Sequence, residues 1–496
     1  MSLESSVLVS GKRTVANVGP VRLHIFLLAC LFLCTLPFVN PIVHGDGVGY
    51  YAYLRAPLIQ RNLQFEQDWH HANLGFVESH VNSQNQLHLD QYTSTGHIGN
   101  LFTVGPAILW TPFFLLAHVM VLGADWFGAQ IPPDGFSFPY RLLVAFGTAL
   151  YGFFGLLLSY LIAGKFLNSS YAFLATVGIW AGSSLPVYMY FNPFWSHAHS
   201  AFVVALFLWY WDRTRPNRKL GQWLVLGLIS GLLVDVYFVN GVFLLIPLVE
   251  SIQGYVKDLR AKDGAGIRVR FILNLFYLAV FGIAILPTLI TRKIIFGGVL
   301  RFGAYTVLPW NWRAPFWNSV LFSSDHGMLS WTPLLGFAIL GLFLPFTGGK
   351  RIKFYLALVV IAFYYVISSY PYWDGLSSYG NRFFISLTPV FVVGLGLLMD
   401  RASRLFRSIR SAYVVQSFML GLFVLWNLAF IFQWGMHMVP ARGDISWGTM
   451  VHNQFVEVPV RVIRSLETYF TDRGTMMKQI EQEDIEQQHL KHEAGE

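Results

Sequence analysis

Long apolar stretches, separated by short polar segments, dominate the chain. A helix that crosses the hydrocarbon core of a membrane needs about 17–25 mostly apolar residues. The stretches that approach this length lie at residues 21–43, 140–163, 171–186, 198–211, 220–238, 239–252, 271–290, 331–346, 354–369, 383–399 and 412–433. The pattern therefore predicts an all-α polytopic membrane protein with about eleven transmembrane helices.

One further apolar stretch, residues 101–123, is interrupted by glycine and two prolines and is rich in aromatic residues. It either crosses the membrane or lies at its surface. Lys and Arg accumulate in cytoplasmic loops, which distinguishes the two cases. If the stretch does not cross, the basic residues of the later loops fall on one side, at 165, 213–219, 257–270, 350–353 and 401–410. We therefore interpret residues 101–123 as a surface or re-entrant element of a first outer loop, 44–139, that contains interfacial helices.

The composition agrees with this interpretation. Only 12% of the residues are charged, against about 25% in soluble domains, and the mean hydropathy is +0.51. A soluble enzyme, a disordered or fibrous chain and a disulfide-stapled secreted domain are therefore excluded. The formal net charge of +8 comes largely from the predicted inner loops, so it indicates topology and no nucleic-acid partner. Cys30 and Cys34 lie on one face of the first predicted helix and are interpreted as packing residues.

The predicted topology divides the chain into three parts. Residues 1–20 form a cytoplasmic N-terminal segment, 21–433 the transmembrane domain, and 434–496 a polar tail on the outer side. The transmembrane domain includes a second large outer loop at 291–330. The first helix is too long for the apolar core of a signal peptide, and no small-residue cleavage site follows it. We therefore expect it to remain as an anchor.

Asp46 is the first candidate for chemistry, in the sequence HGDGVGYYAYL directly after the first predicted helix. Gly45 and Gly47 flank it, so the backbone can turn sharply and a ligand can approach closely. We expect the carboxylate to lie past the outer, C-terminal end of a helix. The negative end of the helix dipole would disfavour its ionisation, which is the direction that a general base needs. The alternative is a turn that ends the helix, with a solvated Asp.

Three arginines on the outer side are candidates for binding a phosphate. Arg382 follows a turn rich in Gly and Ser and begins a predicted helix, where a guanidinium can hold a lipid-borne phosphate with two hydrogen bonds. The alternative is an interfacial anchor. Arg301 and Arg313 lie among tryptophans in the second outer loop. They either hold a headgroup or belong to the aromatic belt of the membrane interface.

Histidines are concentrated in the predicted outer segments. The sequence SHAHS supplies His197 and His199, which either bind a divalent cation together with Asp46 or form hydrogen bonds to substrate or loop. No HExxH or paired CxxC motif is present, which argues against a structural zinc site. Asp235, near the outer end of a predicted helix, is either functional or paired with a neighbouring loop. Motifs for ATP-driven transport, dinucleotide binding and α/β-hydrolases are also absent.

Five segments carry a resemblance to a known family. They read HGDGVGYYAYL, VGPAILWTPFFLLAH, NPFWSHAHSAF, LFSSDHGMLSWTP and WDGLSSYGNRFFISLTP. Together they look like those of bacterial integral-membrane glycosyltransferases of the GT-C superfamily, most of all the dolichyl-phosphate-mannose protein mannosyltransferase and aminoarabinose transferase type. The resemblance covers most of residues 21–399.

The resemblance implies transfer of a sugar from a polyprenyl-phosphate-linked donor to a lipid, glycan or protein acceptor, usually with inversion. The reaction would take place at the outer face of the cytoplasmic membrane, in the cell envelope. Asp46 would be the general base or a metal ligand, and Arg382 would bind the donor phosphate, with Arg301 and Arg313 as further donor-binding candidates. Interfacial helices within 50–123 would roof the cavity.

We expect further side chains to contact the substrates, namely those of Tyr50, Tyr51, His197, His199 and Asp374. Many relatives carry a second acidic residue in the outer turn between the third and fourth spans, and here that turn reads FNPFWSHAHS. Either His197 or His199 replaces the acid, with Asp46 and His199 as the candidate metal ligands, or the reaction needs no metal. A divalent cation is the one cofactor expected.

Two other functions stay open, a transporter or flippase for a lipid-linked sugar and a non-catalytic protein that binds a lipid carrier. A transporter should place polar residues near the middle of the membrane. Here the polar residues lie at the outer ends of the predicted helices, which favours chemistry at the interface. The expected partners are the donor, the acceptor and membrane lipids.

Overall fold

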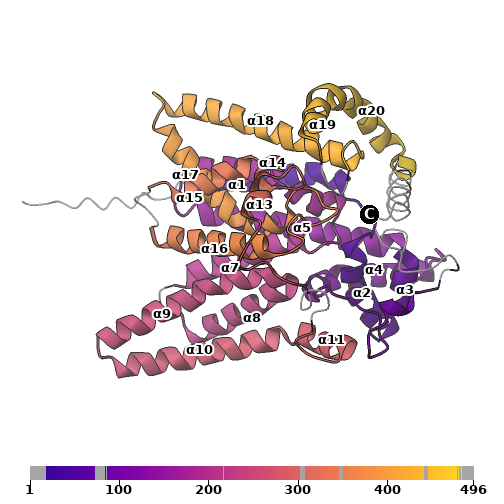
Figure 1. Ribbon diagram of the computed structural model, residues 1–496, viewed down its shortest axis with the longest axis horizontal. Helices are drawn as coiled ribbons and strands as arrows, with labels where there is room; N and C mark the ends of the chain where they lie inside the picture. The colour runs from indigo at the N-terminus through magenta and orange to yellow at the C-terminus, as the bar shows by residue number, and fades with distance from the viewer. Residues whose placement is uncertain are drawn as a thin grey trace, which may run out of the picture.

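The computed structural model describes residues 18–72, 84, 86–215, 217–301, 308–345, 350–440, 445–476, 479 and 482. Most of the N-terminal segment predicted at 1–20, and of the tail beyond 476, lies outside the described residues. Within them, helices account for nearly all regular structure, and an isolated antiparallel β-bridge joins Tyr92 to Ile98. Figure 1 shows the helices as one elongated bundle whose long members run roughly side by side.

The first half of the chain contains helices α1 (Val18–Thr35), α2 (Asp46–Arg55), α3 (Glu66–Ala72), α4 (Gly105–Trp126), α5 (Phe138–Ala163), α6 (Ser169–Ala181), α7 (His197–Thr214) and α8 (Leu220–Val236). The second half contains η6 (Phe238–Leu244), α9 (Leu245–Arg260), α10 (Gly264–Ala284), α11 (Leu286–Phe296), α13 (Trp317–Phe322), α14 (Met328–Trp331), α15 (Leu334–Phe343), α16 (Lys350–Ser369), η7 (Arg382–Leu387), α17 (Thr388–Ser403), α18 (Ile409–Gly435), α19 (Trp447–His452), η8 (Asn453–Glu457) and α20 (Val458–Thr471).

Every one of the eleven apolar stretches predicted to cross the membrane is occupied by helix. Eight helical segments of the described chain are long and apolar enough to cross a membrane, and seven of them coincide with predicted stretches. The eighth is α4. Helices α6, α8 and α15 are apolar but shorter. The prediction of an all-α polytopic membrane protein is confirmed.

The basic loops meet at one end of the bundle. Lys165, after α5, lies 2.7 Å from Asp212 near the end of α7. The Tyr413 hydroxyl of α18 donates to Asn168 before α6. Helix α17 runs from the neighbourhood of Arg382 to the basic run 401–410, so the basic loops and Arg382 lie at opposite ends. This separation is what the positive-inside pattern predicts.

Helix α4 begins at the end of the bundle that carries Arg382. Its Gly105 contacts the backbone of Asp235 at the end of α8. Its Trp110 indole donates to Thr148 of α5 at 2.8 Å, and His118 lies 2.5 Å from the Tyr140 hydroxyl. Helix α4 therefore runs antiparallel to the first half of α5, starting where α8 ends, and extends this end of the bundle as Figure 1 shows.

Helices in the centre approach one another through glycines. A Cβ atom built on Gly341 of α15 would lie 1.9 Å from the carbonyl oxygen of Gly394 in α17. Gly227 of α8 meets the Tyr277 carbonyl of α10 in the same way, at 2.7 Å. Small residues at such crossings permit close van der Waals packing, which drives helix association where no water is present. The α15–α17 contact fixes the helix that follows Arg382.

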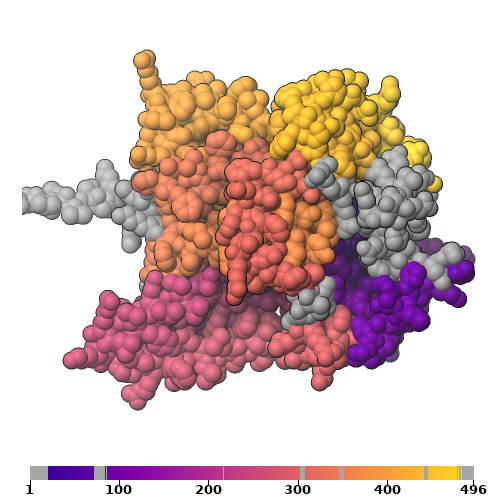
Figure 2. Space-filling view, viewed as in Figure 1, coloured from indigo at the N-terminus to yellow at the C-terminus, as the bar shows by residue number. Residues whose placement is uncertain are grey.

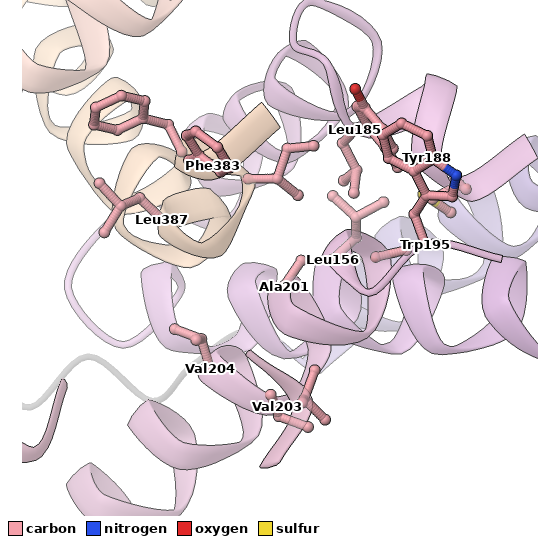
Figure 3. Close-up of a cluster of buried hydrophobic side chains, with 14 of the residues drawn as sticks. Leu156, Leu185, Tyr188, Trp195, Ala201, Val203, Val204, Phe383 and Leu387 are labelled. Carbon is pink, nitrogen blue, oxygen red and sulfur yellow. The ribbon is translucent and has the colours of Figure 1, made fainter. Parts of the chain in front are cut away.

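An apolar cluster packs η7 against the centre of the bundle. It contains Leu156 of α5, three residues of α7 and the two residues Phe383 and Leu387 of η7, all buried (Figure 3). Tyr188 and Trp195 complete one edge of the cluster. Because these side chains are buried together, they anchor the backbone that carries Arg382.

The segment predicted as a polar tail folds into helices over 447–471. Arg473, after α20, donates to the carbonyl oxygens of Pro37 and Val39, and the Tyr469 ring packs against Phe38. Another face of α20 exposes apolar side chains, including Val460 and Ile463. In Figure 2 this segment, in yellow, lies against the end of α18. The C-terminal helices therefore dock beside the exit of α1.

Candidate active site

Asp46 and Arg382 form a direct ion pair. The Arg382 Nη1 atom donates to Asp46 Oδ2 at 2.7 Å, and the two residues lie 336 positions apart in sequence. The Asp46 side chain keeps 33% of its surface exposed, whereas that of Arg382 keeps 10%. The structure thus brings together the two residues that the sequence named as general base and phosphate-binding group.

The backbone around Asp46 is fixed by the turn before α7. Gly45 adopts a φ of 53°, and a Cβ atom there would lie 3.1 Å from the Trp195 ring. The Trp195 indole donates to the His44 carbonyl at 3.2 Å. His44 Nε2 lies 2.9 Å from Asn192 Oδ1. Glycine at position 45 is therefore required both by the left-handed backbone and by the close approach of Trp195.

The expected position of Asp46 relative to a helix dipole is wrong. Helix α1 ends at Thr35, eleven positions before Asp46, and the chain between them contains two prolines. Asp46 is instead the first residue of α2. The carboxylate therefore lies at the positive end of the α2 dipole, not at the negative end of a preceding helix. One of its oxygens accepts a hydrogen bond from Arg382, so access of a hydroxyl group to that oxygen depends on Arg382.

Arg382 is presented by a tight turn and stacked on an aromatic ring. Gly380 adopts a φ of 53°, and Asn381 Nδ2 donates to the Trp373 carbonyl at 2.9 Å. The guanidinium carbon lies 4.3 Å from the centre of the Trp195 ring, a cation–π contact. Within the described part of the chain, Arg382 Nε is buried and has no hydrogen-bond partner. One edge of the guanidinium is thus occupied by Asp46 and another donor is unused.

His197 belongs to the wall beside Arg382, while His199 points into the packing of α4 and α5. The His197 ring lies 4.9 Å from the Tyr188 ring and 5.8 Å from the Tyr237 ring. The His199 ring lies 5.1 Å from Trp110 and 5.5 Å from Tyr151. The structure therefore brings only the first of the two histidines next to the Asp46–Arg382 pair.

The remaining predicted residues have separate surroundings. The Tyr50 hydroxyl donates to Ser196 Oγ at 2.9 Å, and the Tyr51 hydroxyl donates to the Gly135 carbonyl at 2.6 Å. These bonds attach α2 to the loops around it. Arg301 and Arg313 are exposed in segment 291–330, which was predicted to be the second outer loop. Asp235 is buried at the end of α8, under the first turn of α4.

A second polar group was missed by sequence reasoning. Ligand atoms of Asp325, His326 and Asp374 lie within 4.8 Å of one another, and among the described residues this is the group that could hold a metal ion. The predicted ligands Asp46 and His199 are not part of it. Asp374 was expected to contact substrate, and the adjacent Asp and His of the LFSSDHG segment were the available signal for the other two.

The two polar groups are neighbours. A Cβ atom built on Gly375, next to Asp374, would lie 3.3 Å from Arg382 Nε. Burial, reinforced by the positive charge of Arg382, lowers the pKa of His326 to about 3. The imidazole is therefore neutral at physiological pH, with one nitrogen lone pair available.

The chain is similar in fold to solved membrane-protein structures. ArnT from Cupriavidus metallidurans in the apo state aligns over 95% of this chain and 78% of its own, with 13% identity and a TM-score of 0.43. The same protein bound to undecaprenyl phosphate aligns over 92% and 76%, with 14% identity and a TM-score of 0.43. The archaeal oligosaccharyltransferase AglB from Archaeoglobus fulgidus, in complex with an inhibitory peptide and a dolichol-phosphate, aligns over 88% of this chain and 54% of its own, with 12% identity and a TM-score of 0.46.

No family model and no curated protein matches the chain.

Proposed function

We propose that the chain is a glycosyltransferase that moves a sugar from a polyprenyl-phosphate-linked donor to a hydroxyl group of a lipid, glycan or protein acceptor. The observation that carries the proposal is the pairing of Asp46 with Arg382: a partly exposed carboxylate held by a buried guanidinium. A carboxylate can accept the proton of a hydroxyl group, and a guanidinium can bind a phosphate. Both groups are needed for this reaction, and they lie in direct contact.

In the proposed reaction, the acceptor hydroxyl gives its proton to the Asp46 carboxylate as its oxygen attacks the anomeric carbon. The bond between that carbon and the phosphate oxygen breaks, and its electron pair leaves with the polyprenyl phosphate. Attack opposite the leaving group inverts the anomeric centre. Arg382 stabilises the negative charge that develops on the phosphate. Phosphate leaves without protonation, so a second carboxylic acid of the kind that glycoside hydrolases use is not required.

Arg382 couples donor binding to the reactivity of Asp46. In the structure one oxygen of the Asp46 carboxylate accepts a hydrogen bond from the Arg382 guanidinium. A donor phosphate that binds to Arg382 would compete with Asp46 for this hydrogen bond. The carboxylate oxygen would then be available to the acceptor hydroxyl when the sugar is in place.

The position of the pair favours transfer over transport. Asp46 and Arg382 lie at one end of α17, opposite the basic loops at 401–410. If those loops are cytoplasmic, the site is at the outer face of the membrane. A transporter that moves its substrate across the membrane would place its binding groups near the middle of the bundle.

The test measures transfer and transport on the same preparation. The full chain is reconstituted into liposomes with radiolabelled polyprenyl-phosphate mannose or polyprenyl-phosphate aminoarabinose, plus a membrane-lipid extract and peptides as acceptors. The wild-type protein should release polyprenyl phosphate and label an acceptor. Asp46→Asn should lower the rate by about 10²- to 10⁴-fold, the usual contribution of a general base.

Asp400→Asn is the matched control, because Asp400 lies at the opposite end of α17 and pairs with the exposed Arg404. It should transfer at the wild-type rate. Full transfer by Asp46→Asn would exclude Asp46 as the base. Movement of the intact donor across the bilayer without release of its sugar would replace the transferase proposal by the transporter.

A further inference from the structure

We propose that Asp325, His326 and Asp374 bind one divalent cation, of the zinc or manganese class, directly beside Arg382. The binding of the cation is independent of the proposed function. Its role in the reaction, which is to supply a second positive charge to the donor phosphate, rests on that function.

The geometry of the three side chains suits a metal ion. Their ligand atoms all lie within 4.8 Å of one another. Bonds of about 2.0–2.2 Å at tetrahedral angles separate two ligand atoms by about 3.3–3.6 Å. Ligand atoms at the 4.8 Å limit must therefore approach each other by about 1 Å to meet around one ion, which small side-chain rotations allow.

His326 supplies an independent observation. Its ring is fully buried, and in the described structure neither ring nitrogen makes a hydrogen bond of good geometry, although the Asp374 backbone lies close to the ring. The nearest carboxylate oxygen, Asp325 Oδ1, lies 3.5 Å from Nδ1. Leaving a buried polar group unsatisfied costs about 1–3 kcal/mol. A cation between the three side chains would satisfy one of these nitrogens.

Both loops hold their ligands in place before any ion binds. In the first loop, Ser323 Oγ accepts from the Asp325 backbone at 3.0 Å, and the Ser324 carbonyl accepts from the Trp331 indole at 2.8 Å. His326 itself adopts a left-handed φ of 56°. In the second loop, Gly375 adopts a φ of 77° directly after Asp374. Such preorganisation lowers the entropic cost of binding.

The donor set limits the choice of ion. Two carboxylates and one imidazole favour zinc or manganese over magnesium and calcium, which prefer ligand sets made only of oxygen. Three protein ligands also leave coordination positions open for other oxygens, as in catalytic rather than structural metal sites. A phosphate oxygen can take such a position.

The position of the proposed site next to Arg382 indicates the role of the ion in the reaction. Gly375 approaches Arg382 Nε so closely that a Cβ atom there would lie 3.3 Å from it. The charge of Arg382 also acts on His326. An ion held by His326 and Asp374 would therefore lie close to the guanidinium, and a phosphate bound to Arg382 would be near both charges. The ion and the guanidinium would share the charge of the leaving group, which leaves Asp46 free to act as the base.

The experiment measures metal binding directly. The full chain, purified in detergent and stripped with EDTA, is titrated with Mn²⁺ and followed by electron paramagnetic resonance, and separately with Zn²⁺ followed by calorimetry. One equivalent should bind. Asp374→Asn and His326→Gln should each weaken binding by at least about 10-fold, because loss of even an outer-shell partner has that effect. The ion should raise the melting temperature of the wild type and not that of Asp374→Asn.

Asp90→Asn is the matched control, because Asp90 is an exposed acid of the first outer loop. It should bind the ion as the wild type does. Equal binding by Asp374→Asn and the wild type, or no stoichiometric binding by the wild type, would overturn the site. Binding that disappears in the variants, with no sugar transfer by the wild type, would support the site while contradicting the proposed function.

Discussion

Arg382 reaches across 336 residues of sequence to hold Asp46 at 2.7 Å, and its Nε atom remains without a partner among the described residues. Arg382 therefore uses one donor to hold Asp46 and keeps a second, buried donor unpaired. If a phosphate binds to this guanidinium, the affinity for phosphate should depend on Arg382 in a measurable way.

Arg382→Lys should weaken binding of undecaprenyl phosphate without unfolding the protein. A lysine keeps the charge next to Asp46 but loses the second donor and the flat contact with Trp195. Charge-assisted hydrogen bonds contribute about 1.5–3 kcal/mol, so the Kd should rise by about 10- to 150-fold. Binding can be measured by microscale thermophoresis in detergent.

Arg404→Ala, at the other end of α17 and 58% exposed, serves as the control and should bind like the wild type. An unchanged Kd for Arg382→Lys, with a normal melting temperature, would remove Arg382 from the phosphate site.

Asp68→Asn should destabilise the first outer loop. Arg55 Nε and Asp68 Oδ1 lie 2.7 Å apart, and both side chains are almost completely buried. Removing one member of a buried ion pair leaves an uncompensated charge, at a cost of about 3–5 kcal/mol. The melting temperature should therefore fall markedly.

Replacing both members, as in Arg55→Met with Asp68→Leu, should restore most of the lost stability, because no charge is then left buried. The exposed pair Arg461–Glu457 provides a control, since its removal should change stability by less than about 0.5 kcal/mol. Equal effects at the buried and exposed pairs would contradict the prediction.

Gly341→Ala should separate α15 from α17. The added methyl group would lie 1.9 Å from the Gly394 carbonyl oxygen, so one helix must shift. Overpacking of this kind costs about 1–3 kcal/mol. Because α17 begins next to Arg382, donor binding should weaken together with thermal stability.

Gly421→Ala in α18 is the natural control, because no atom lies within 4 Å of the added Cβ. Alanine is the better helix former, so this variant should be as stable as the wild type or more so. A stable Gly341→Ala protein would mean that the α15–α17 crossing is looser than the structure indicates.

The orientation of the chain can be tested with single cysteines in a background that lacks Cys30 and Cys34. Arg407→Cys lies in the basic loop after α17, and Arg313→Cys lies in the second outer loop; both positions are exposed. A membrane-impermeant maleimide should label Arg313→Cys on intact cells and Arg407→Cys only after lysis. The reverse pattern would invert the topology.

The positions of the helices were predictable because length and hydropathy are local properties. Each stretch near 20 apolar residues became a helix, although the ends moved: the first was expected to run to 43, and α1 ends at Thr35. That shift reversed the dipole argument for Asp46. Prolines 37 and 41 were the signal for the earlier end.

The candidate site was only partly predictable. Asp46 and Arg382 were both named as candidates, but no local sequence pattern predicts a contact between residues so far apart. Grouping His326 with Asp374 required the fold, because the two loops meet only after α14–α17 pack. The role of α20 was overlooked for another reason: its apolar residues alternate with charged ones, so the segment has low mean hydropathy and reads as a tail.

The distance in sequence between Asp46 and Arg382 also determines how long Asp46 exists in the nascent chain before its partner is synthesised. At about 5–20 residues per second, a ribosome needs roughly 17–70 s to make the 336 residues that separate them. During that interval the chain contains Asp46 without the cation that pairs with it. Trp195 is also synthesised before Arg382. The contacts of Arg473 with the loop after α1 come later still. A nascent chain arrested before position 382 would therefore contain Asp46 and most of the bundle but lack the guanidinium that completes the site.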